Sequence, residues 1–348
     1  MKKLYFSAVL TLLTAATAIA QTTVVTPANA PMGLALLNDE LYITEHVMAR
    51  LSKVNLTEQN PELTDVVTEG FTIPHDVVEH EGLLYVSDFF ANTVYRINPA
   101  EENPVAEVVV EFIDMPSGLA FRGDELYIAL FDNGDIVKIN INDEIPVPVA
   151  VVTELGQPIK IEFHGDDLYI ADGEANKISK IDVTEANPEI LDVITDLTTP
   201  NCLIFNGNDL YFNELNGGRI LKADITEENP EVLEVVTGVA VISDFAIRNN
   251  ELYMAERATN KISKVALSTL SVQKAERQKI SLYPNPASNY IALSGFSETG
   301  AYTIYNMLGM EVMSGETANG MPISVQDIAP GTYFLKVGSS NLQTFIKR

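Results

Sequence analysis

The chain has 348 residues, of which 46% are hydrophobic and 20% are charged, a composition typical of a folded protein rather than a disordered one. Its formal net charge of -26 disfavours nucleic acid and anionic membranes as partners, although it attracts cations and basic partners. Cys202 is the only cysteine, which excludes an internal disulfide. The length accommodates one large domain and a small one.

Residues 1–20 predict a secretory signal peptide. Lys2 and Lys3 precede an apolar run, and small residues at 18–20 favour cleavage before Gln21. The apolar run is short for a bilayer span, and no later segment approaches about 18 unbroken apolar residues. We therefore expect a protein that passes through the periplasm and is not an integral membrane protein.

A Leu-Tyr motif followed by small, apolar and acidic residues occurs six times, at 41–45, 84–88, 126–130, 168–172, 210–214 and 252–256. The tyrosines are 43, 42, 42, 42 and 42 residues apart. A fixed period near forty residues, built of short β-rich runs, is typical of propeller blades. The pattern predicts an all-β fold, with a six-bladed β-propeller over residues 21–268.

Each repeat contains four strand-like runs, which the fourth repeat shows at 159–163, 167–172, 177–183 and 190–195. The sixth repeat lacks its fourth run. Residues 22–25 supply a matching one, because Val25 precedes Pro31 by the same six residues that separate Ile194 from Pro200. The N-terminal strand is therefore expected to complete the last blade and remove an exposed sheet edge.

Two sets of charged residues recur with the repeat and are interpreted as scaffold. Acids end five of the second strands, where we expect them to accept hydrogen bonds from backbone N–H groups: Glu45, Asp88, Asp172, Glu214 and Glu256. Bases follow in all six repeats and are expected opposite the tyrosines: Lys53, Arg96, Lys138, Lys180, Lys222 and Lys264.

The first strand of each blade lines the channel of a propeller, and four of these strands carry polar residues where small apolar ones are expected. They are His75, Asp76, Lys160, Glu162, Asn201, Cys202, Ser243 and Asp244. Polar groups in a narrow channel need partners, either one another, water or a ligand. The pattern predicts a ligand site here, with a self-satisfied channel plug as the alternative.

Several chemical roles are open for these residues. His75 with Asp76 or Asp244 is a candidate general base, and Lys160 with Glu162 is a candidate ion pair, anion clamp or catalytic pair. The oxygens of Asp76, Asn201 and Asp244 suit calcium or another divalent cation. Cys202 is interpreted as a small buried residue, since no histidine neighbours it in sequence.

Aromatic residues interrupt the repeat in turns on the same face. Phe89 and Phe90 occupy one turn and Phe131 the equivalent turn of the next blade, where exposed rings can grip a peptide or stack on a sugar. His46 and Arg257 lie in the equivalent turns of blades one and six. The predicted ligand-binding set is His75, Asp76, Phe89, Phe90, Phe131, Lys160, Asn201, Ser243 and Asp244.

Beyond a predicted linker at 269–279, acids become rare and short β runs predict a small β-sandwich over residues 280–348. Tyr-Pro-Asn-Pro at 283–286, Tyr-Asn-Met-Leu-Gly at 305–309, Gly-Thr-Tyr at 331–333 and the terminal Lys347-Arg348 resemble the C-terminal sorting domain of the type IX secretion system. The resemblance implies handling by that machinery and delivery to the medium or the outer cell surface.

The repeats resemble NHL and YWTD six-bladed propellers, and more distantly gluconolactonases. The first two families imply binding of an extracellular protein, peptide or glycan. The third implies a metal-assisted hydrolase or lactonase, but only Asn201 falls on a comparable position. Whether the chain is an enzyme stays open at this point. We expect ligand binding on the channel face, with a lactonase and a purely structural surface protein as alternatives.

Overall fold

The computed structural model describes residues 21–270, 281–294, 300–306, 310–318, 320–337 and 343–348. The signal peptide predicted at 1–20 lies outside these residues, as does the predicted linker, except that 269–270 end the short helix α1 (Leu267–Leu270). The chain forms two compact units, Met1–Leu270 and Ser271–Arg348. None of the helices in the described part has the length and apolar character needed to cross a membrane.

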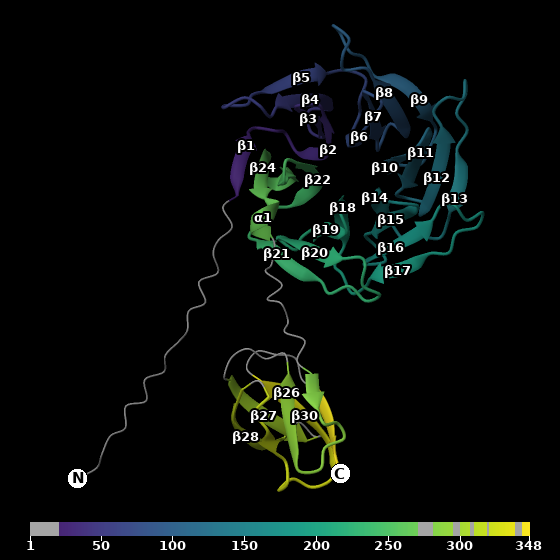
Figure 1. Cartoon of the computed structure of the whole chain (residues 1–348). Helices are drawn as coiled ribbons and strands as arrows, with labels where there is room; N and C mark the ends of the chain where they lie inside the picture. Colours follow the sequence, from purple (N-terminus) through teal and green to yellow (C-terminus); the bar gives the residue numbers. More distant parts are fainter. Residues whose placement is uncertain (1–20, 271–280, 295–299, 307–309, 319, 338–342) are drawn as a thin grey trace. The chain divides into compact units, whose positions relative to one another are not determined.

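The first unit is a ring of six four-stranded antiparallel sheets, which are the blades of a β-propeller (Figure 1). In the first five blades the strands follow in sequence from the centre of the ring outwards. Blade one contains β2 (Pro31–Leu37), β3 (Glu40–Glu45), β4 (Arg50–Asn55) and β5 (Leu63–Val67). Blade two contains β6 (Pro74–His80), β7 (Leu83–Asp88), β8 (Thr93–Ile97) and β9 (Glu107–Glu111). Blade three contains β10 (Pro116–Arg122), β11 (Glu125–Leu130), β12 (Asp135–Asn140) and β13 (Val149–Val152).

The remaining blades complete the ring. Blade four contains β14 (Pro158–His164), β15 (Asp167–Asp172), β16 (Lys177–Asp182) and β17 (Leu191–Ile194). Blade five contains β18 (Pro200–Asn206), β19 (Asp209–Glu214), β20 (Arg219–Asp224) and β21 (Leu233–Thr237). Blade six contains β22 (Ile242–Arg248), β23 (Glu251–Glu256), the 3-10 helix η1 (Arg257–Thr259), β24 (Lys261–Ala266) and the N-terminal β1 (Thr22–Val25).

The N-terminal strand closes the ring. β1 pairs antiparallel with β24, with Thr22 opposite Lys264 and Val25 opposite Ile262. This pairing confirms the predicted closure, and it covers a sheet edge that would otherwise expose unpaired backbone groups. Residues at the two ends of the propeller sequence therefore hold one another in a single sheet.

The repeated Leu-Tyr motif forms the core between blades. Tyr42 is 2% exposed and belongs to a cluster with Val77 and Leu84 of the next blade. Its cross-strand partner is Lys53, and the basic residue is opposite the tyrosine in all six blades. In five blades the lysine ammonium lies 5.7–5.9 Å from the ring centroid. These contacts confirm that the repeated bases belong to the scaffold.

The acids that end the second strands organise the connections between blades. Asp88 is fully buried and accepts hydrogen bonds from the backbone N–H groups of Thr72, Ile73 and Ala91. Asp172 accepts the equivalent bonds in blade four. The carboxylates thus satisfy backbone donors in irregular segments, as the scaffold interpretation predicts.

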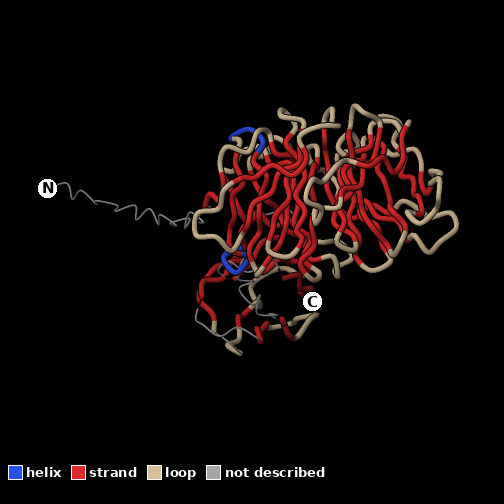
Figure 2. The backbone as a smooth tube through the Cα atoms, turned by 90° about the horizontal axis from the view of Figure 1, so that it is seen from above, coloured by secondary structure: helices blue, strands red, loops and turns tan. Residues whose placement is uncertain are grey.

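Glycine sets how closely the central strands approach. A Cβ on Gly118 would lie 2.9 Å from the carbonyl oxygen of Ile159 in the next blade, and a Cβ on Gly33 would lie 2.7 Å from the Val77 nitrogen. Turns gather on two opposite faces of the ring (Figure 2). We call the face that carries the turns between second and third strands, and the connections between blades, the channel face.

The second unit is a β-sandwich, as predicted. One sheet contains β25 (Ser281–Tyr283), β26 (Tyr290–Ser294) and β29 (Ile323–Ser324). The other contains β28 (Glu311–Thr317), β27 (Gly300–Asn306), β30 (Gly331–Val337) and β31 (Gln343–Lys347). Ile291, Ile304 and Leu335 share the core between them. Asn285 of the Tyr-Pro-Asn-Pro motif bonds to the β31 backbone, whereas 307–309 of the middle motif lie outside the described residues.

Candidate functional site at the channel face

Three charged residues from alternate blades meet at the centre of the ring. Lys160 Nζ of blade four lies 2.7 Å from Asp76 Oδ1 of blade two and 3.0 Å from Asp244 Oδ2 of blade six. Asp76 also accepts a hydrogen bond from the Leu119 N–H at 2.9 Å, and Asp244 accepts one from the Leu34 N–H at 2.8 Å. All three side chains are buried. We call Asp76, Lys160 and Asp244 the central triad.

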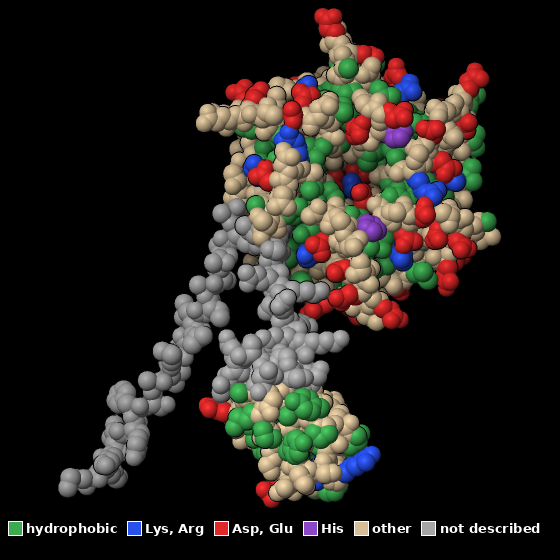
Figure 3. Space-filling view, in the orientation of Figure 1, with side chains coloured by type: hydrophobic (Ala, Val, Ile, Leu, Met, Phe, Trp, Pro, Cys, Tyr) green, Lys and Arg blue, Asp and Glu red, His purple; other side chains and the backbone are tan. Residues whose placement is uncertain are grey.

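The triad occupies one repeat position, which is small in the odd blades: Gly33, Gly118 and Cys202. Burial opposes a charge on Lys160, but Asp244 and Asp76 raise the pKa of its ammonium above the ordinary value. The charged lysine therefore ties three blades across the channel. Figure 3 shows acidic and basic atoms in the hollow at the centre of the ring.

The predicted pairing of Lys160 with Glu162 is wrong, because the ammonium contacts the two aspartates instead. Glu162 is partly exposed. Burial raises the pKa of its carboxyl to about 7, and Lys160 opposes that shift while Asp244 and Asp76 add to it. The pair is thus not an anion clamp, since its cation is already bound by two carboxylates.

Two other predicted ligand residues join neighbouring blades. Asn201 Nδ2 donates to the Ile242 carbonyl oxygen at 3.0 Å, and Ser243 Oγ donates to the Pro31 carbonyl oxygen at 2.5 Å. Cys202 is fully buried, and burial raises the pKa of its thiol. These contacts show how the three side chains serve the ring, and they agree with the interpretation of Cys202 as a packing residue.

The contacts of the central triad are incompatible with the divalent cation expected at Asp76, Asn201 and Asp244. The Lys160 ammonium lies between the two carboxylates, where a divalent ion would have to lie. The expected dyad of His75 with an aspartate is not formed either, because the Asp76 oxygens bind Lys160 and backbone N–H groups. His75 stacks instead on Phe89, with 5.4 Å between ring centroids.

A second group of deviating residues lies where each second strand enters the turn on the channel face. The residue there donates its backbone N–H to the connection that precedes its own blade, in every blade. In chain order these equivalent residues are His46, Phe89, Phe131, Gly173, Leu215 and Arg257. Since blade six adjoins blade one, four consecutive blades present arginine, histidine, phenylalanine and phenylalanine in that order.

These side chains contact one another along the arc. Arg257 Nη2 donates to His46 Nδ1 at 3.4 Å, and Phe89 lies 5.2 Å from Phe131 and 5.3 Å from Phe90 between ring centroids. Phe90 is 56% exposed, whereas Phe89 and Phe131 are partly buried. We call the set of Arg257, His46, His75, Phe89, Phe90 and Phe131 the channel-face arc. In the sequence, Arg257 and His46 are distinguished only as turn residues, and the signal that groups them with the phenylalanines is the repeat position that all four share.

The polar members of the arc are short of partners. His46 Nε2 and His75 Nδ1 are buried and have no hydrogen-bond partner within the described residues. Burial lowers the pKa of His75 to about 4, opposed by Asp76 and assisted by His46, Lys160 and Arg257, so its ring is neutral at pH 7. A neutral imidazole without a partner offers one hydrogen-bond donor or acceptor to a ligand.

Arg257 differs from the other arginines of the propeller. Five of the six in residues 21–270 form ion pairs: Arg50, Arg96, Arg122, Arg219 and Arg248. Arg257 is exposed and has no carboxylate within ion-pair distance among the described residues. In a chain of net charge -26, Arg257 is therefore a cation whose charge no carboxylate of the described residues neutralises by an ion pair.

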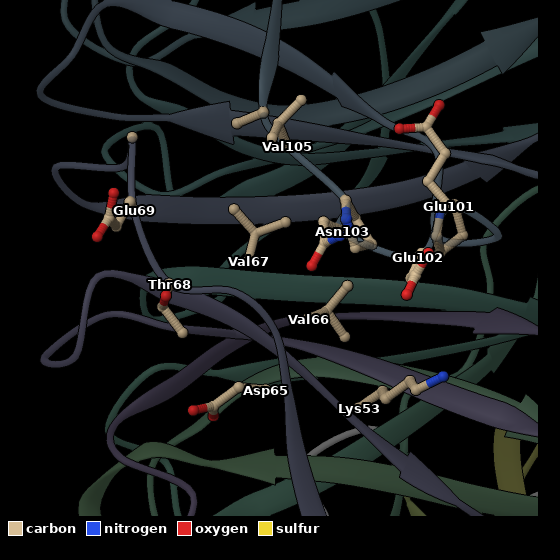
Figure 4. Close-up of a pocket in the computed structure, with 14 residues that line it drawn as sticks. Lys53, Asp65, Val66, Val67, Thr68, Glu69, Glu101, Glu102, Asn103 and Val105 are labelled. Carbon is tan, nitrogen blue, oxygen red and sulfur yellow. The ribbon is translucent and has the colours of Figure 1, made fainter.

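A cavity of about 750 Å³ lies elsewhere, between β5 and the connection that follows β8. Figure 4 shows Val66 and Val67 at its centre, with Glu69 on one side and Glu101 and Glu102 on the other. Its lining residues include no histidine or cysteine, and Lys53 within it is paired with Glu40. The lining of this cavity therefore lacks the histidine and arginine side chains found in the channel-face arc.

Comparisons with known proteins identify the tail and the ring. Residues 281–348 match the secretion system C-terminal sorting domain. Virginiamycin B lyase from Staphylococcus aureus has a TM-score of 0.54 and 16% identity, over 72% of this chain and 99% of that one. A protein of unknown function from Bacteroides thetaiotaomicron has a TM-score of 0.58 and 14% identity, over 71% and 72%. Aldose sugar dehydrogenase from Streptomyces coelicolor has a TM-score of 0.56 and 13% identity, over 70% and 96%.

No curated protein matches the sequence. At these identities the structural similarity shows the propeller fold alone. The sorting domain shows more, because it assigns the chain to export by the type IX secretion system. The protein is therefore a β-propeller with a C-terminal sorting domain, secreted or displayed at the cell surface.

Proposed function

We propose that the propeller binds an extracellular peptide, or a peptide segment of a protein, on its channel-face arc. The ligand carries an aromatic or apolar group next to a carboxylate. The single observation behind this proposal is the order of side chains on four consecutive blades, from the unpaired Arg257 through His46 to Phe89 and Phe131. A cationic end and an aromatic end fit such a ligand in one orientation.

The aromatic end supplies contact area and the cationic end supplies orientation. Phe90 is 56% exposed and packs edge-on against Phe89, so a ligand ring gains contact without rearrangement of the core. Arg257 donates to His46 and has no carboxylate partner among the described residues, so its other N–H groups can bind the carboxylate of a ligand. The negative charge of the rest of the chain repels every anion, so a carboxylate ligand that also carries an apolar group is favoured by the additional contact with the phenylalanines.

The two alternatives have less support. A metal-assisted hydrolase or lactonase needs free channel carboxylates, but Asp76 and Asp244 are held by Lys160. A purely structural surface protein accounts for the paired charges of the central triad. It does not account for the unpartnered imidazole nitrogens and the unpaired Arg257 on the channel face.

The test is an array of short peptides that end in phenylalanine, tyrosine or leucine, probed with the purified chain. We expect binding to peptides with a free C-terminal carboxylate and loss of binding when that carboxylate is amidated. Phe90→Ser and Arg257→Gln should each weaken binding about tenfold or more, as truncated contact residues at interface centres do. Ile145→Ser, a change at a residue 78% exposed outside the arc, is the matched control.

Two results would contradict the proposal. One is binding that persists in Phe90→Ser and Arg257→Gln, which would locate the ligand elsewhere. The other is binding to acidic glycans alone, which would keep the arc as the site but exclude a peptide ligand.

A further inference from the structure

The face opposite the channel face carries a repeated contact between blades. The residue that ends a first strand reaches the hairpin of the next blade. Arg248 pairs with Asp39 across blades six and one, and Arg122 pairs with Asp166 across blades three and four. At the same position in blade four, His164 Nε2 lies 3.1 Å from a carbonyl oxygen in the blade five hairpin. This contact joins neighbouring hairpins through a basic residue.

The junction of blades two and three changes this contact in two ways. His80 stands where Arg122, His164 and Arg248 stand in their blades, but here the next hairpin brings the Asp124 carboxylate near the imidazole. Glu81 then adds a second carboxylate. One ligand-type atom from each of His80, Glu81 and Asp124 lies within 4.8 Å of the others. A guanidinium cannot bind a metal ion, whereas an imidazole is the commonest protein ligand for one.

Glu81 occupies a position where the other blades have glycine or asparagine. Its φ is 51°, in the left-handed region, and the equivalent residues are Asn38, Gly123, Gly165, Gly207 and Asn249. Glycine and asparagine adopt that region readily and glutamate does not. The glutamate therefore costs the hairpin stability, and its placement beside His80 is unexplained by turn geometry.

The His80 ring is packed between aromatic side chains, but its Nε2 has no hydrogen-bond partner among the described residues. It stacks on Phe121 with 4.0 Å between centroids and 7° between planes, and it meets Tyr85 edge-on at 6.5 Å. Its Nε2 is buried without a hydrogen-bond partner within the described residues. Glu81 and Asp124 are exposed, so their carboxylates rotate freely towards a common centre.

From these contacts we propose that His80, Glu81 and Asp124 bind a divalent transition-metal ion of the Zn²⁺ class. One imidazole nitrogen and two carboxylate oxygens are ligands that Zn²⁺ accepts at about 2.0–2.2 Å, with water in the remaining position. The ligand atoms lie within 4.8 Å of one another, and the two acids are exposed, which leaves their side chains room to turn towards a common ion. The nitrogen ligand disfavours Ca²⁺ and Mg²⁺, which take oxygen ligands.

The test is isothermal titration calorimetry of the purified full chain with Zn²⁺ alone, and with Ca²⁺ in parallel. We expect one Zn²⁺ per chain and no comparable heat from Ca²⁺. His80→Arg and Glu81→Asn should each weaken Zn²⁺ binding at least about tenfold, since even loss of an outer-shell partner has that effect. Glu174→Gln removes one exposed carboxylate on the channel face and should bind as the unchanged chain does.

The variants are chosen to preserve folding. Arginine at position 80 restores the contact of blades three and six, and asparagine at position 81 restores the turn residue of blades one and six. Both should keep the Tm measured without metal, while the Zn²⁺-induced rise in Tm seen in the unchanged chain disappears. Absence of Zn²⁺ binding, or equal binding in all variants, would overturn the proposal without bearing on the peptide site.

Discussion

The central triad and the channel-face arc are both departures from the repeat, but they differ in how far their charged groups are paired with one another. In the triad, Lys160 binds two carboxylates and each carboxylate also accepts a backbone hydrogen bond, so that only Asp244 Oδ1 is buried without a hydrogen-bond partner among the described residues. In the arc, Arg257 has no carboxylate partner among the described residues and His75 Nδ1 is unpartnered. A deviation from a repeat therefore favours a ligand site where the deviating charged groups are not paired with one another.

The largest loss of stability is expected from a substitution in the central triad. Lys160→Met would leave Asp76 and Asp244 buried with no countercharge, which typically destabilises a protein by about 3–5 kcal/mol. We expect that loss in the free energy of unfolding, measured with chemical denaturant at pH 7. Binding-site residues of the arc are not touched by this change.

Two further variants show whether the loss comes from the unpaired charges. Lys53→Met breaks a half-exposed pair with Glu40 and should change stability by no more than about 1 kcal/mol. Combining Lys160→Met with Asp76→Asn and Asp244→Asn should restore much of the lost stability, because it removes both unpaired buried charges while the amide oxygen of each asparagine still accepts one backbone hydrogen bond. An equal loss in Lys53→Met would remove the distinction between the centre and the periphery.

Glu162, a neighbour of the triad on the same strand, should make the stability of the propeller depend on pH. Its pKa of about 7 exceeds the ordinary 4.5, so the folded chain holds this proton more tightly than the unfolded chain does. The contribution of this tightly held proton to the free energy of unfolding is complete below about pH 4.5 and is lost as the pH rises through 7. Glu162→Gln should therefore raise the free energy of unfolding more at pH 8 than at pH 5, by about 1–3 kcal/mol. Glu174→Gln, at an exposed site, should show no such difference.

The sequence predicts the ring because its period is explicit. Tyrosines 42 or 43 residues apart, and a spare strand at 22–25, are local signals that need no knowledge of contacts. The triad is different, because Asp76 and Lys160 are 84 residues apart and meet only through the curvature of the ring. Glu162 is much closer than Asp244 to Lys160 in the sequence, but the ion pair of Lys160 is with Asp244. The sequence indicates only part of the arc, because Phe89 and Phe131 are conspicuous as aromatic turn residues, whereas Arg257 shares their repeat position without being aromatic.

The smallest effect expected is on the stability of the arc variants. Phe90→Ser and Arg257→Gln remove exposed groups with few internal contacts, so each should change the free energy of unfolding by no more than about 0.5 kcal/mol. The measurement is the same denaturant titration used for Lys160→Met, which places both regions on one scale. A loss above about 2 kcal/mol in either variant would mean that the arc supports the fold as the triad does. Its unpartnered groups would then no longer argue for a ligand.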